Sequence, residues 1–229
     1  MTKSVNDEVA IIIPVYNEAS VIRHVLENVQ KRFKYIICID DGSRDDSVGE
    51  IIKTKAMLVQ HPINMGQGAA LQTGIEFARQ LPVKFFVTFD ADGQHRLEDA
   101  MAMLTELKTD KFDIILGSRF LGSSIGMKKN KERILKLAIG FSNLTSGVKL
   151  TDTHNGLRAF NRNVAETMQI TMPDMAHASE ILEIIASQKY RYKEIPVTIE
   201  YTDYSKAKGQ SLINAVNIGF DMLLRKVSK

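Results

Sequence analysis

The chain has 229 residues, 44% of them hydrophobic and 25% charged, and its formal net charge is +3. This composition is typical of a globular protein and excludes a disordered, collagen-like or disulfide-rich chain. The small net charge does not indicate nucleic-acid binding, and the single cysteine, Cys38, excludes a disulfide framework and a cysteine-rich zinc site.

The N-terminal segment, residues 1–8, is polar and lacks the apolar core of a signal peptide, so we expect a polar tail and a cytoplasmic protein. No stretch approaches the roughly 18 uncharged apolar residues that a membrane-spanning helix needs. Cys38 lies in an apolar run, which predicts a buried, inert thiol.

The first half of the chain alternates apolar runs with helical patterns. We expect strands at 9–13, 35–39, 57–60, 84–89 and 113–116. Helical spacing of apolar residues predicts helices at 21–29, 44–54, 70–78 and 97–107. Strands that alternate with helices in this way predict βαβ units, and therefore an α/β fold with a mostly parallel central sheet flanked by helices.

The second half is less regular. We expect a loop at 122–126, a helix at 131–146 and a polar turn that enters a short strand within 152–160. A helix at 177–188, a strand at 192–201 and an amphipathic C-terminal helix within 211–229 follow. No linker separates the halves, so we predict a single domain over residues 1–229.

Polar or glycine-rich clusters follow five successive predicted strands. In open α/β sheets, ligands bind outside the carboxyl ends of the strands, so these clusters are expected to share one site. A single cluster would be an ordinary turn or helix cap, whereas five together indicate function. The clusters are Pro14-Val15-Tyr16-Asn17-Glu18, Asp40-Asp41-Gly42-Ser43, Asn64-Met65-Gly66-Gln67-Gly68, Asp90-Ala91-Asp92-Gly93-Gln94-His95 and Gly117-Ser118-Arg119.

The fourth cluster contains two carboxylates at alternate positions. Asp90 and Asp92 point the same way along an extended segment, with the side chain of Gln94 two residues further on. Oxygen ligands of this kind suit Mg²⁺ or Mn²⁺, which bind through few carboxylates together with substrate phosphates. Asp-x-Asp is common in exposed turns, but here it ends the apolar run 85–89.

Other nucleotide-binding patterns are absent from the sequence. Gly66-Gln67-Gly68 does not make a dinucleotide-binding fingerprint, because the third residue after Gly68 is Leu71 and the glycines do not follow the first strand. The sequence also contains no P-loop and no His-Glu-x-x-His motif. These observations disfavour NAD binding and P-loop chemistry.

The ordered series of motifs resembles the family-2 glycosyltransferases of the GT-A fold. The branch it resembles contains dolichyl-phosphate mannose synthase and the bacterial polyprenyl-phosphate transferases. The resemblance covers about residues 9–211. Beyond the five clusters, the matching motifs are Asp152-x-x-x-Gly156-Leu157-Arg158, Glu180-Ile181-Leu182 and Glu194-Ile195-Pro196-Val197.

The resemblance implies roles on the donor side. The residues that would line the nucleotide pocket are Pro14, Tyr16, Glu18, Gly68 and Ala91. One of Asp40 and Asp41 would hydrogen-bond the base. Asp90, Asp92 and Gln94 would hold a divalent metal, Mg²⁺ or Mn²⁺, against the diphosphate. Arg119 and Arg133 would contact phosphate, although Arg133 also fits an exposed basic helix face.

The resemblance also implies inversion at the anomeric carbon. Asp152 is a candidate base or organiser of the acceptor site, with a structural hydrogen-bonding role as the alternative. His177 and Glu180 are second candidates, although a histidine at a helix start is often a cap or a packed side chain. A base is needed for a hydroxyl acceptor, but not for a lipid phosphate, whose oxygen is already an anion.

Basic and apolar residues crowd the segment 127–141, which favours contact with a membrane surface. Our leading hypothesis is a metal-dependent, inverting glycosyltransferase. It moves a sugar from a nucleotide diphospho-sugar to a polyprenyl phosphate, bound peripherally at the cytoplasmic face of the membrane or to a membrane-protein partner. The alternatives are transfer to a sugar hydroxyl in cell-surface polysaccharide synthesis, a noncatalytic nucleotide-sugar-binding subunit and a nucleotidyltransferase.

Overall fold

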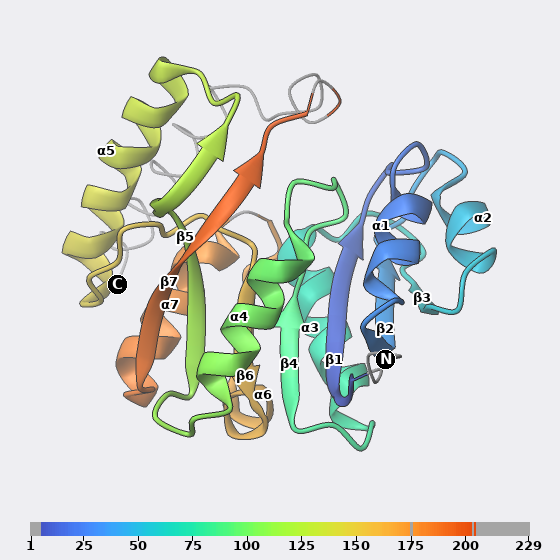
Figure 1. The fold of residues 1–229 in the computed structure, drawn as a ribbon, viewed down its shortest axis with the longest axis horizontal. Helices are drawn as coiled ribbons and strands as arrows, with labels where there is room; N and C mark the ends of the chain where they lie inside the picture. Colours follow the sequence, from blue (N-terminus) through green and yellow to red (C-terminus); the bar gives the residue numbers. More distant parts are fainter. Residues whose placement is uncertain (1–5, 175, 203, 205–229) are drawn as a thin grey trace.

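In the part of the chain that the structure describes, seven strands form one sheet in the order β3-β2-β1-β4-β6-β5-β7 (Figure 1). The computed structural model describes residues 6–174, 176–202 and 204. Strand β6 is antiparallel to its neighbours β4 and β5, and the other strand pairs are parallel. The strands are β1 (Asn6–Val15), β2 (Phe33–Asp40), β3 (Met57–Gln60), β4 (Phe85–Thr88), β5 (Ile114–Ile125), β6 (Arg158–Asn161) and β7 (Tyr192–Glu200).

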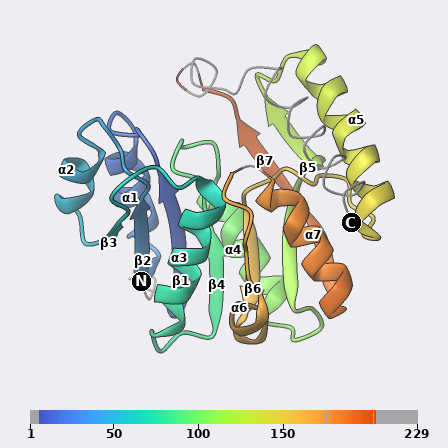
Figure 2. The ribbon, with the colours of Figure 1, turned by 180° about the vertical axis from the view of Figure 1, so that it is seen from behind.

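Helices cover both faces of this sheet. Helices α1 (Ile22–Val29), α2 (Ser47–Ile52) and α4 (Leu97–Leu107) lie on one face. Helices α3 (Gln67–Arg79), α6 (Arg162–Thr167) and α7 (His177–Gln188) lie on the other, as the view from behind shows (Figure 2). Helix α5 (Lys129–Ser146) lies beyond the β5 and β7 edge and contacts α7. The predicted α/β fold with a mostly parallel sheet is therefore confirmed.

The central strand β1 separates two hydrophobic cores. Because side chains alternate along a strand, Val9, Ile11 and Ile13 pack into the core under α1 and α4, whereas Ala10 and Ile12 pack into the core under α3. This strand is fully buried at these positions, which explains its continuous apolar sequence. Cys38 is buried as predicted, and burial raises the pKa of its thiol.

Three elements differ from the predictions. Strand β1 begins at Asn6, so part of the expected polar tail belongs to the sheet. The segment 122–126, predicted as a loop, lies largely within β5, because residues 123–125 pair with residues 198–200 of β7. Helix α6 was not predicted, and its N-terminus is capped by the side chain of Asn161. The predicted helix within 211–229 lies outside the described residues.

Two glycines inside helices allow a matched test of this packing. A side chain at Gly74 of α3 would overlap Ile12 and Ile39, whereas nothing lies near the corresponding position of Gly140 in α5. Gly74→Ala should lower the free energy of unfolding by about 1–2 kcal/mol through overpacking. Gly140→Ala should raise it by about 0.5–1 kcal/mol through helix propensity. Urea unfolding of both variants checks this, and equal effects of the two changes would contradict the described packing of α3.

Candidate functional site

The predicted strand-end clusters do come together at one edge of the sheet. Val15 at the end of β1 lies opposite Asp40 at the end of β2. Asp90 follows β4 by two residues, and β4 is the other neighbour of β1. The carboxyl ends of three adjacent parallel strands therefore place Asp40 and Asp90 on either side of β1.

Asp90 is held by two side chains and lies close against a glycine. His95 Nε2 lies 2.8 Å from Asp90 Oδ2, and Gln67 Nε2 at the start of α3 donates to Asp90 Oδ1 at 3.3 Å. A side chain at Gly156 would overlap the Asp90 carboxylate, so only glycine leaves room there. The carbonyl of Gly156 in turn accepts from the Thr88 hydroxyl at 2.6 Å, which ties this turn to the end of β4.

Asp92 carries an unfavourable negative charge. Burial and the neighbouring charge of Asp90 raise its pKa to about 6. Burial also opposes ionisation of Asp90, but the contact with His95 and the charge of Arg158 outweigh it, so the pKa of Asp90 lies below its ordinary value. The site therefore contains two close carboxylates whose joint ionisation calls for a further cation.

A divalent cation fits this pair. Within the described residues, no group of three or more His, Cys, Asp or Glu side chains could hold a metal, so the protein offers two carboxylates and not a complete cage. That incomplete set suits Mg²⁺ or Mn²⁺, which usually bind through one or two carboxylates and complete their shell with water and substrate phosphates. Asp90 and Asp92 are the residues that would hold the metal.

Gln94 has a different geometry from the one predicted. Its backbone N–H and its side-chain amide nitrogen donate to the two oxygens of Asp92 at 3.0 and 2.7 Å. The amide nitrogen, and not the oxygen, thus faces the site, so Gln94 orients Asp92 in this structure. The Gln94 carbonyl accepts from Glu200 N–H at 3.1 Å, which fastens this loop to the end of β7.

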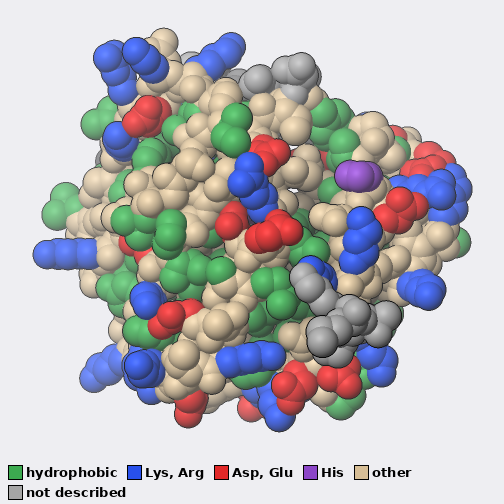
Figure 3. Space-filling model, in the orientation of Figure 1, with side chains coloured by type: hydrophobic (Ala, Val, Ile, Leu, Met, Phe, Trp, Pro, Cys, Tyr) green, Lys and Arg blue, Asp and Glu red, His purple; other side chains and the backbone are tan. Residues whose placement is uncertain are grey.

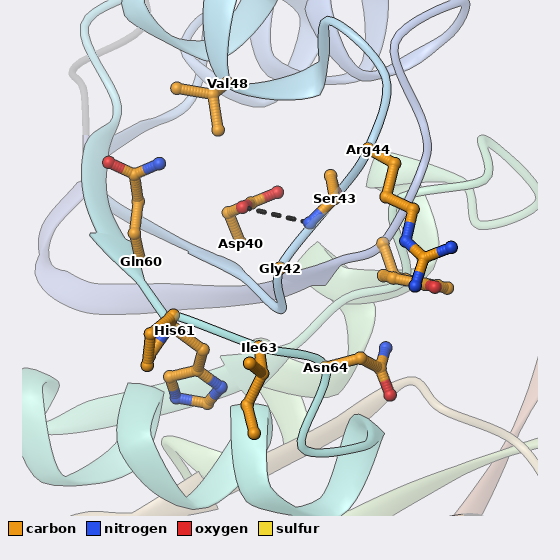
Figure 4. Close-up of a pocket in the computed structure, with 11 residues that line it drawn as sticks. Asp40, Gly42, Ser43, Arg44, Val48, Gln60, His61, Ile63 and Asn64 are labelled. Atoms are coloured by element: carbon orange, nitrogen blue, oxygen red, sulfur yellow. Dashed lines mark hydrogen bonds between the residues drawn. The ribbon is translucent and has the colours of Figure 1, made fainter.

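A pocket of about 410 Å³ lies beside the ends of β2 and β3 (Figure 4). Asp40 lies in its wall and is 2% exposed, and its Oδ2 accepts from Ser43 N–H at 3.3 Å. Asp40 Oδ1 is buried and has no hydrogen-bond partner among the described residues. A buried carboxylate oxygen without a donor is costly, so a ligand N–H that reached this atom from the pocket would make a favourable hydrogen bond. The other lining residues are Tyr16, Gly42, Arg44, Val48, Gln60, His61, Pro62, Ile63 and Asn64.

Asp41, the alternative base contact, is fully engaged elsewhere. Its carboxylate accepts from the backbone N–H groups of Met65 and Gly66 at 2.9 and 2.7 Å and contacts His61 Nδ1 at 2.7 Å. His61 Nε2 reaches Thr73 on α3 at 3.0 Å. Asp41 therefore shapes the loop that leads into α3, and Asp40 is the one of the two with an oxygen that lacks a hydrogen-bond partner among the described residues.

The other residues that were predicted to line the nucleotide pocket lie in different surroundings. Tyr16 lines the pocket and is 39% exposed. Glu18 is buried, and its Oε2 accepts from the Tyr204 hydroxyl at 2.7 Å. Pro14 lies inside β1 opposite Ile39, and Ala91 packs into the hydrophobic core.

Gly68 allows the start of α3 to lie close to the backbone of residues 172–173. Its N–H donates to the carbonyl of Pro173 at 2.5 Å, and a side chain at this position would overlap the carbonyl of Met172. The N–H groups of Gly68 and Ala69 in the first turn of α3, which could otherwise bind a phosphate, both donate to the Pro173 carbonyl.

Arg119 and Asp152 form a buried ion pair. Arg119 Nε donates to Asp152 Oδ2 at 2.6 Å, and the Arg119 backbone N–H donates to the same oxygen at 3.0 Å. The Asp152 side chain is 1% exposed and that of Arg119 is 9% exposed. Arg119 also donates to the Tyr201 hydroxyl at 2.8 Å and to the carbonyl of His154 at 3.1 Å. Asp152 thus orients an arginine and is closed to solvent.

Glu194 on β7 holds the turn that carries Asp152. Its carboxylate accepts from the backbone N–H groups of Thr151 and Asp152 and from the Thr151 hydroxyl, at 2.8–3.0 Å. The motif at 194–197 was noted in the sequence without a role. In the structure, its glutamate places Asp152.

His177 and Glu180 are also buried and engaged. Glu180 accepts from Thr171 N–H at 3.0 Å and from Met172 N–H at 2.9 Å, so it organises the loop that caps α3. His177 Nδ1 lies 2.7 Å from the carbonyl of Asp174. Burial and the nearby charge of Arg158 lower the pKa of His177 to about 4, so its ring is neutral at pH 7.

Three residues to which sequence reasoning assigned no role, Arg158, His95 and Tyr201, contact or act on the carboxylates and the arginine of the site. Arg158 is 4% exposed, and both Asp90 and Asp152 act on it electrostatically. His95 holds Asp90, and Tyr201 accepts from Arg119. Arg158 and His95 lay within motifs already noted, whereas nothing in the sequence marks Tyr201. Arg133 is exposed on α5.

Comparisons with known proteins give a consistent result. The family model described as "Glycosyl transferase family 2" matches residues 10–168. The chain is 31% identical to a UDP-N-acetylglucosamine–dolichyl-phosphate N-acetylglucosaminyltransferase of Methanococcus voltae, over 96% of this chain and 96% of that protein. It is 27% identical to the dolichyl-phosphate beta-glucosyltransferase ALG5D of Trichomonas vaginalis, over 90% of this chain and 69% of that protein.

A solved structure supports the fold. Glucosyl-3-phosphoglycerate synthase from Mycobacterium tuberculosis, in complex with Mn²⁺, uridine diphosphate and phosphoglyceric acid, superposes with a TM-score of 0.73. The match covers 96% of this chain and 77% of that chain at 14% sequence identity, so it bears on the fold alone. The predicted GT-A fold is confirmed.

The buried neutral His177 predicts a pH-dependent stability. Its pKa of about 4 in the folded chain is below the ordinary value of 6.5. Between these two pH values, the histidine is protonated in the unfolded chain and neutral in the folded chain. The free energy of unfolding should therefore fall as the pH drops below 6.5, by about 2 kcal/mol at pH 5. His177→Asn removes this contribution while keeping a donor for Asp174.

Urea unfolding at pH 7 and pH 5 tests the prediction. Relative to the unmodified chain, His177→Asn should gain about 2 kcal/mol of stability on going to pH 5. His24→Asn, at an exposed position of α1, is the control for the same exchange of residues. A parallel pH dependence in the unmodified chain and His177→Asn would contradict the neutral, buried state of His177.

Proposed function

Because the chain belongs to glycosyl transferase family 2, and is therefore a glycosyltransferase, we propose a specific reaction for it. It transfers a sugar from a nucleotide diphospho-sugar to a polyprenyl phosphate, with inversion at the anomeric carbon and with Mg²⁺ or Mn²⁺ as cofactor. The reaction takes place at the cytoplasmic face of a membrane. Relatives named for dolichyl-phosphate and undecaprenyl-phosphate acceptors support the acceptor class.

The observation that carries this proposal is the inaccessibility of the three candidate bases that the sequence indicated, Asp152, Glu180 and His177. Asp152 is closed off by Arg119, Glu180 is engaged by backbone N–H groups, and His177 is buried. A sugar hydroxyl must lose a proton as it attacks, and none of these three groups can reach it. A phosphate acceptor brings an oxygen that is already negative, so it needs positioning and not deprotonation.

The chemistry then balances without a protein base. A phosphate oxygen of the acceptor attacks the anomeric carbon from one side, and the bond from that carbon to the diphosphate oxygen breaks on the other. The nucleoside diphosphate leaves with the electron pair, and the product is a sugar phosphodiester. A divalent metal, when bound, neutralises charge that develops on the leaving diphosphate. Asp90 and Asp92 hold the metal position, with Gln94 and His95 orienting them.

The pocket at Asp40 favours uracil as the base of the donor. Asp40 offers one free acceptor, Oδ1, because Oδ2 already accepts from Ser43. Uracil presents a single ring N–H between two carbonyls, which matches one acceptor. Guanine presents two adjacent donors and would require both carboxylate oxygens.

The outer face of α5 supports contact with a membrane surface. Leu137 and Leu144, seven residues apart and on the same side of the helix, are 76% and 85% exposed. Lysine and arginine side chains gather over the end of α5 that lies uppermost in Figure 3. Exposed leucines beside basic residues favour the interface of an anionic bilayer. Among the described residues, no helix is both long and apolar enough to cross a membrane.

Turnover with purified protein tests the proposal directly. With Mn²⁺, a panel of UDP-, GDP- and dTDP-sugars and a polyprenyl phosphate, we expect release of UDP and formation of a lipid-linked sugar. The same donors with saccharide acceptors should give at least tenfold less product, because none of the three candidate bases can reach a hydroxyl. Liquid chromatography with mass detection follows both products.

The other outcomes discriminate between the alternatives. Preference for a saccharide over the lipid phosphate would establish hydroxyl transfer. Donor binding without turnover on any acceptor would favour a noncatalytic binding subunit. Release of GDP and not UDP would contradict the assignment of the base.

Substitution of Asp92 separates catalysis from folding. Asp92→Asn should reduce turnover at least 100-fold, because one of two metal-holding carboxylates is lost. The same change should leave the free energy of unfolding at pH 7 unchanged or raise it, because it relieves the repulsion and desolvation that raise the Asp92 pKa.

The measurement combines turnover, UDP affinity with and without Mn²⁺, and thermal unfolding. Glu98→Gln, an exposed acid on the nearby helix α4, is the matched control and should keep full activity. Undiminished turnover of Asp92→Asn would rule out the proposed metal position.

A further inference from the structure

The two faces of α5 carry different basic residues. With about 3.6 residues per turn, Lys131 shares a face with Ser142, eleven residues later, and Ser142 is 3% exposed. Arg133 shares a face with Leu137 and Leu144, which are among the most exposed apolar side chains of the described residues. Lys131 therefore points toward the body of the protein, and Arg133 points away from it.

Lys131 reaches the candidate site. Its Nζ lies 4.6 Å from the centre of the Tyr201 ring, and the hydroxyl of that ring accepts from Arg119. Partial burial and the charge of Arg119 lower the pKa of Lys131, and the charge of Asp92 acts on it in the opposite direction. Two cations thus flank one phenol close to a metal-holding carboxylate.

Three of the five N–H donors of the Arg119 side chain are already engaged by the protein. Its Nε, Nη1 and Nη2 each donate to a protein oxygen, on Asp152, Tyr201 and His154 respectively. For Lys131, by contrast, no carboxylate lies within ion-pair distance in the described part of the chain, and an ammonium has three donors. The positive charges of Lys131 and Arg119 repel each other, and a bound anion would reduce this repulsion. The region around Tyr201 therefore attracts a phosphate.

We propose that Lys131, and not Arg133, is the α5 residue that binds a substrate phosphate. This inference rests on the proposed function, because it takes its ligand from that reaction. The ligand is a phosphate group of the nucleoside diphosphate or of the prenyl phosphate acceptor. The ring of Tyr201 holds the ammonium group of Lys131 in place, and Asp152 fixes Arg119 beside it.

The test compares two substitutions two residues apart on the same helix. Lys131→Met keeps an unbranched chain over the Tyr201 ring but removes the charge, and Arg133→Met does the same on the outer face. Lys131→Arg restores a charge at the inner position. Calorimetry measures the dissociation constants of UDP with Mn²⁺ and of farnesyl phosphate in the presence of UDP and Mn²⁺.

We expect Lys131→Met to weaken one of these probes about 10- to 100-fold, as for a lost charge-assisted hydrogen bond. Weaker UDP binding assigns Lys131 to the donor, and weaker farnesyl phosphate binding with unchanged UDP assigns it to the acceptor. Lys131→Arg should recover most of the affinity, and Arg133→Met should stay within threefold. Unchanged thermal unfolding in Lys131→Met excludes a merely structural effect.

The proposal is overturned if Lys131→Met leaves both probes within threefold, or if Arg133→Met weakens either probe as much as Lys131→Met does. A failure of the proposed function gives a different pattern. In that case the unmodified chain binds UDP but produces no lipid-linked sugar, and the dissociation constants of UDP and farnesyl phosphate in the two variants still decide between Lys131 and Arg133.

Discussion

The site depends on an alternation of positive and negative side chains along the carboxyl edge of the sheet. Asp90 and Asp152 both act on the buried guanidinium of Arg158, and Asp152 is paired with Arg119. Each of these charges would be very costly if it were buried alone. Together they form a series in which every charge has an opposite neighbour. The fold builds this series by placing β6, which begins at Arg158, antiparallel between β4 and β5.

This series explains why Asp152 is unsuited to proton transfer. A base must be exposed to its substrate and free to gain a proton, whereas Asp152 is closed off and its charge holds Arg119 in place. The same reasoning applies to Glu180, whose charge is used by the loop at 171–172. Asp92 differs, because its charge is opposed by Asp90 and by burial. The negative charge of Asp92 has no ion-pair partner among the described residues and lies where a metal cation would bind. The paired charges of Asp152 and Arg119 instead hold the structure of the site.

The sequence predicted the strands, the edge where ligands gather and the types of residues found there, because hydrophobic periodicity and strand-end polarity are local signals. It could not distinguish Asp40 from Asp41, since the difference lies in partners from the loop at 61–66. Gly68 was assigned to the nucleotide, yet its N–H is capped by Pro173, more than 100 residues away in the sequence. The extension of β5 was missed because small residues at 122–124 resemble a loop until β7 pairs with them. In each case a long-range contact decided between two local readings.

Helix α5 joins the two sides of the proposed reaction. Its inner face carries Lys131 and packs through Ile139 and Ser142, while its outer face exposes Leu137 and Leu144. A helix of this length moves as a rigid unit. A membrane surface that binds Leu137 and Leu144 would therefore also fix the position of Lys131 relative to Tyr201. The helix contacts the rest of the described chain mainly through α7, so its position is less constrained than that of the sheet helices. A lipid surface would therefore supply both the acceptor and the restraint that keeps a phosphate-binding cation at the site.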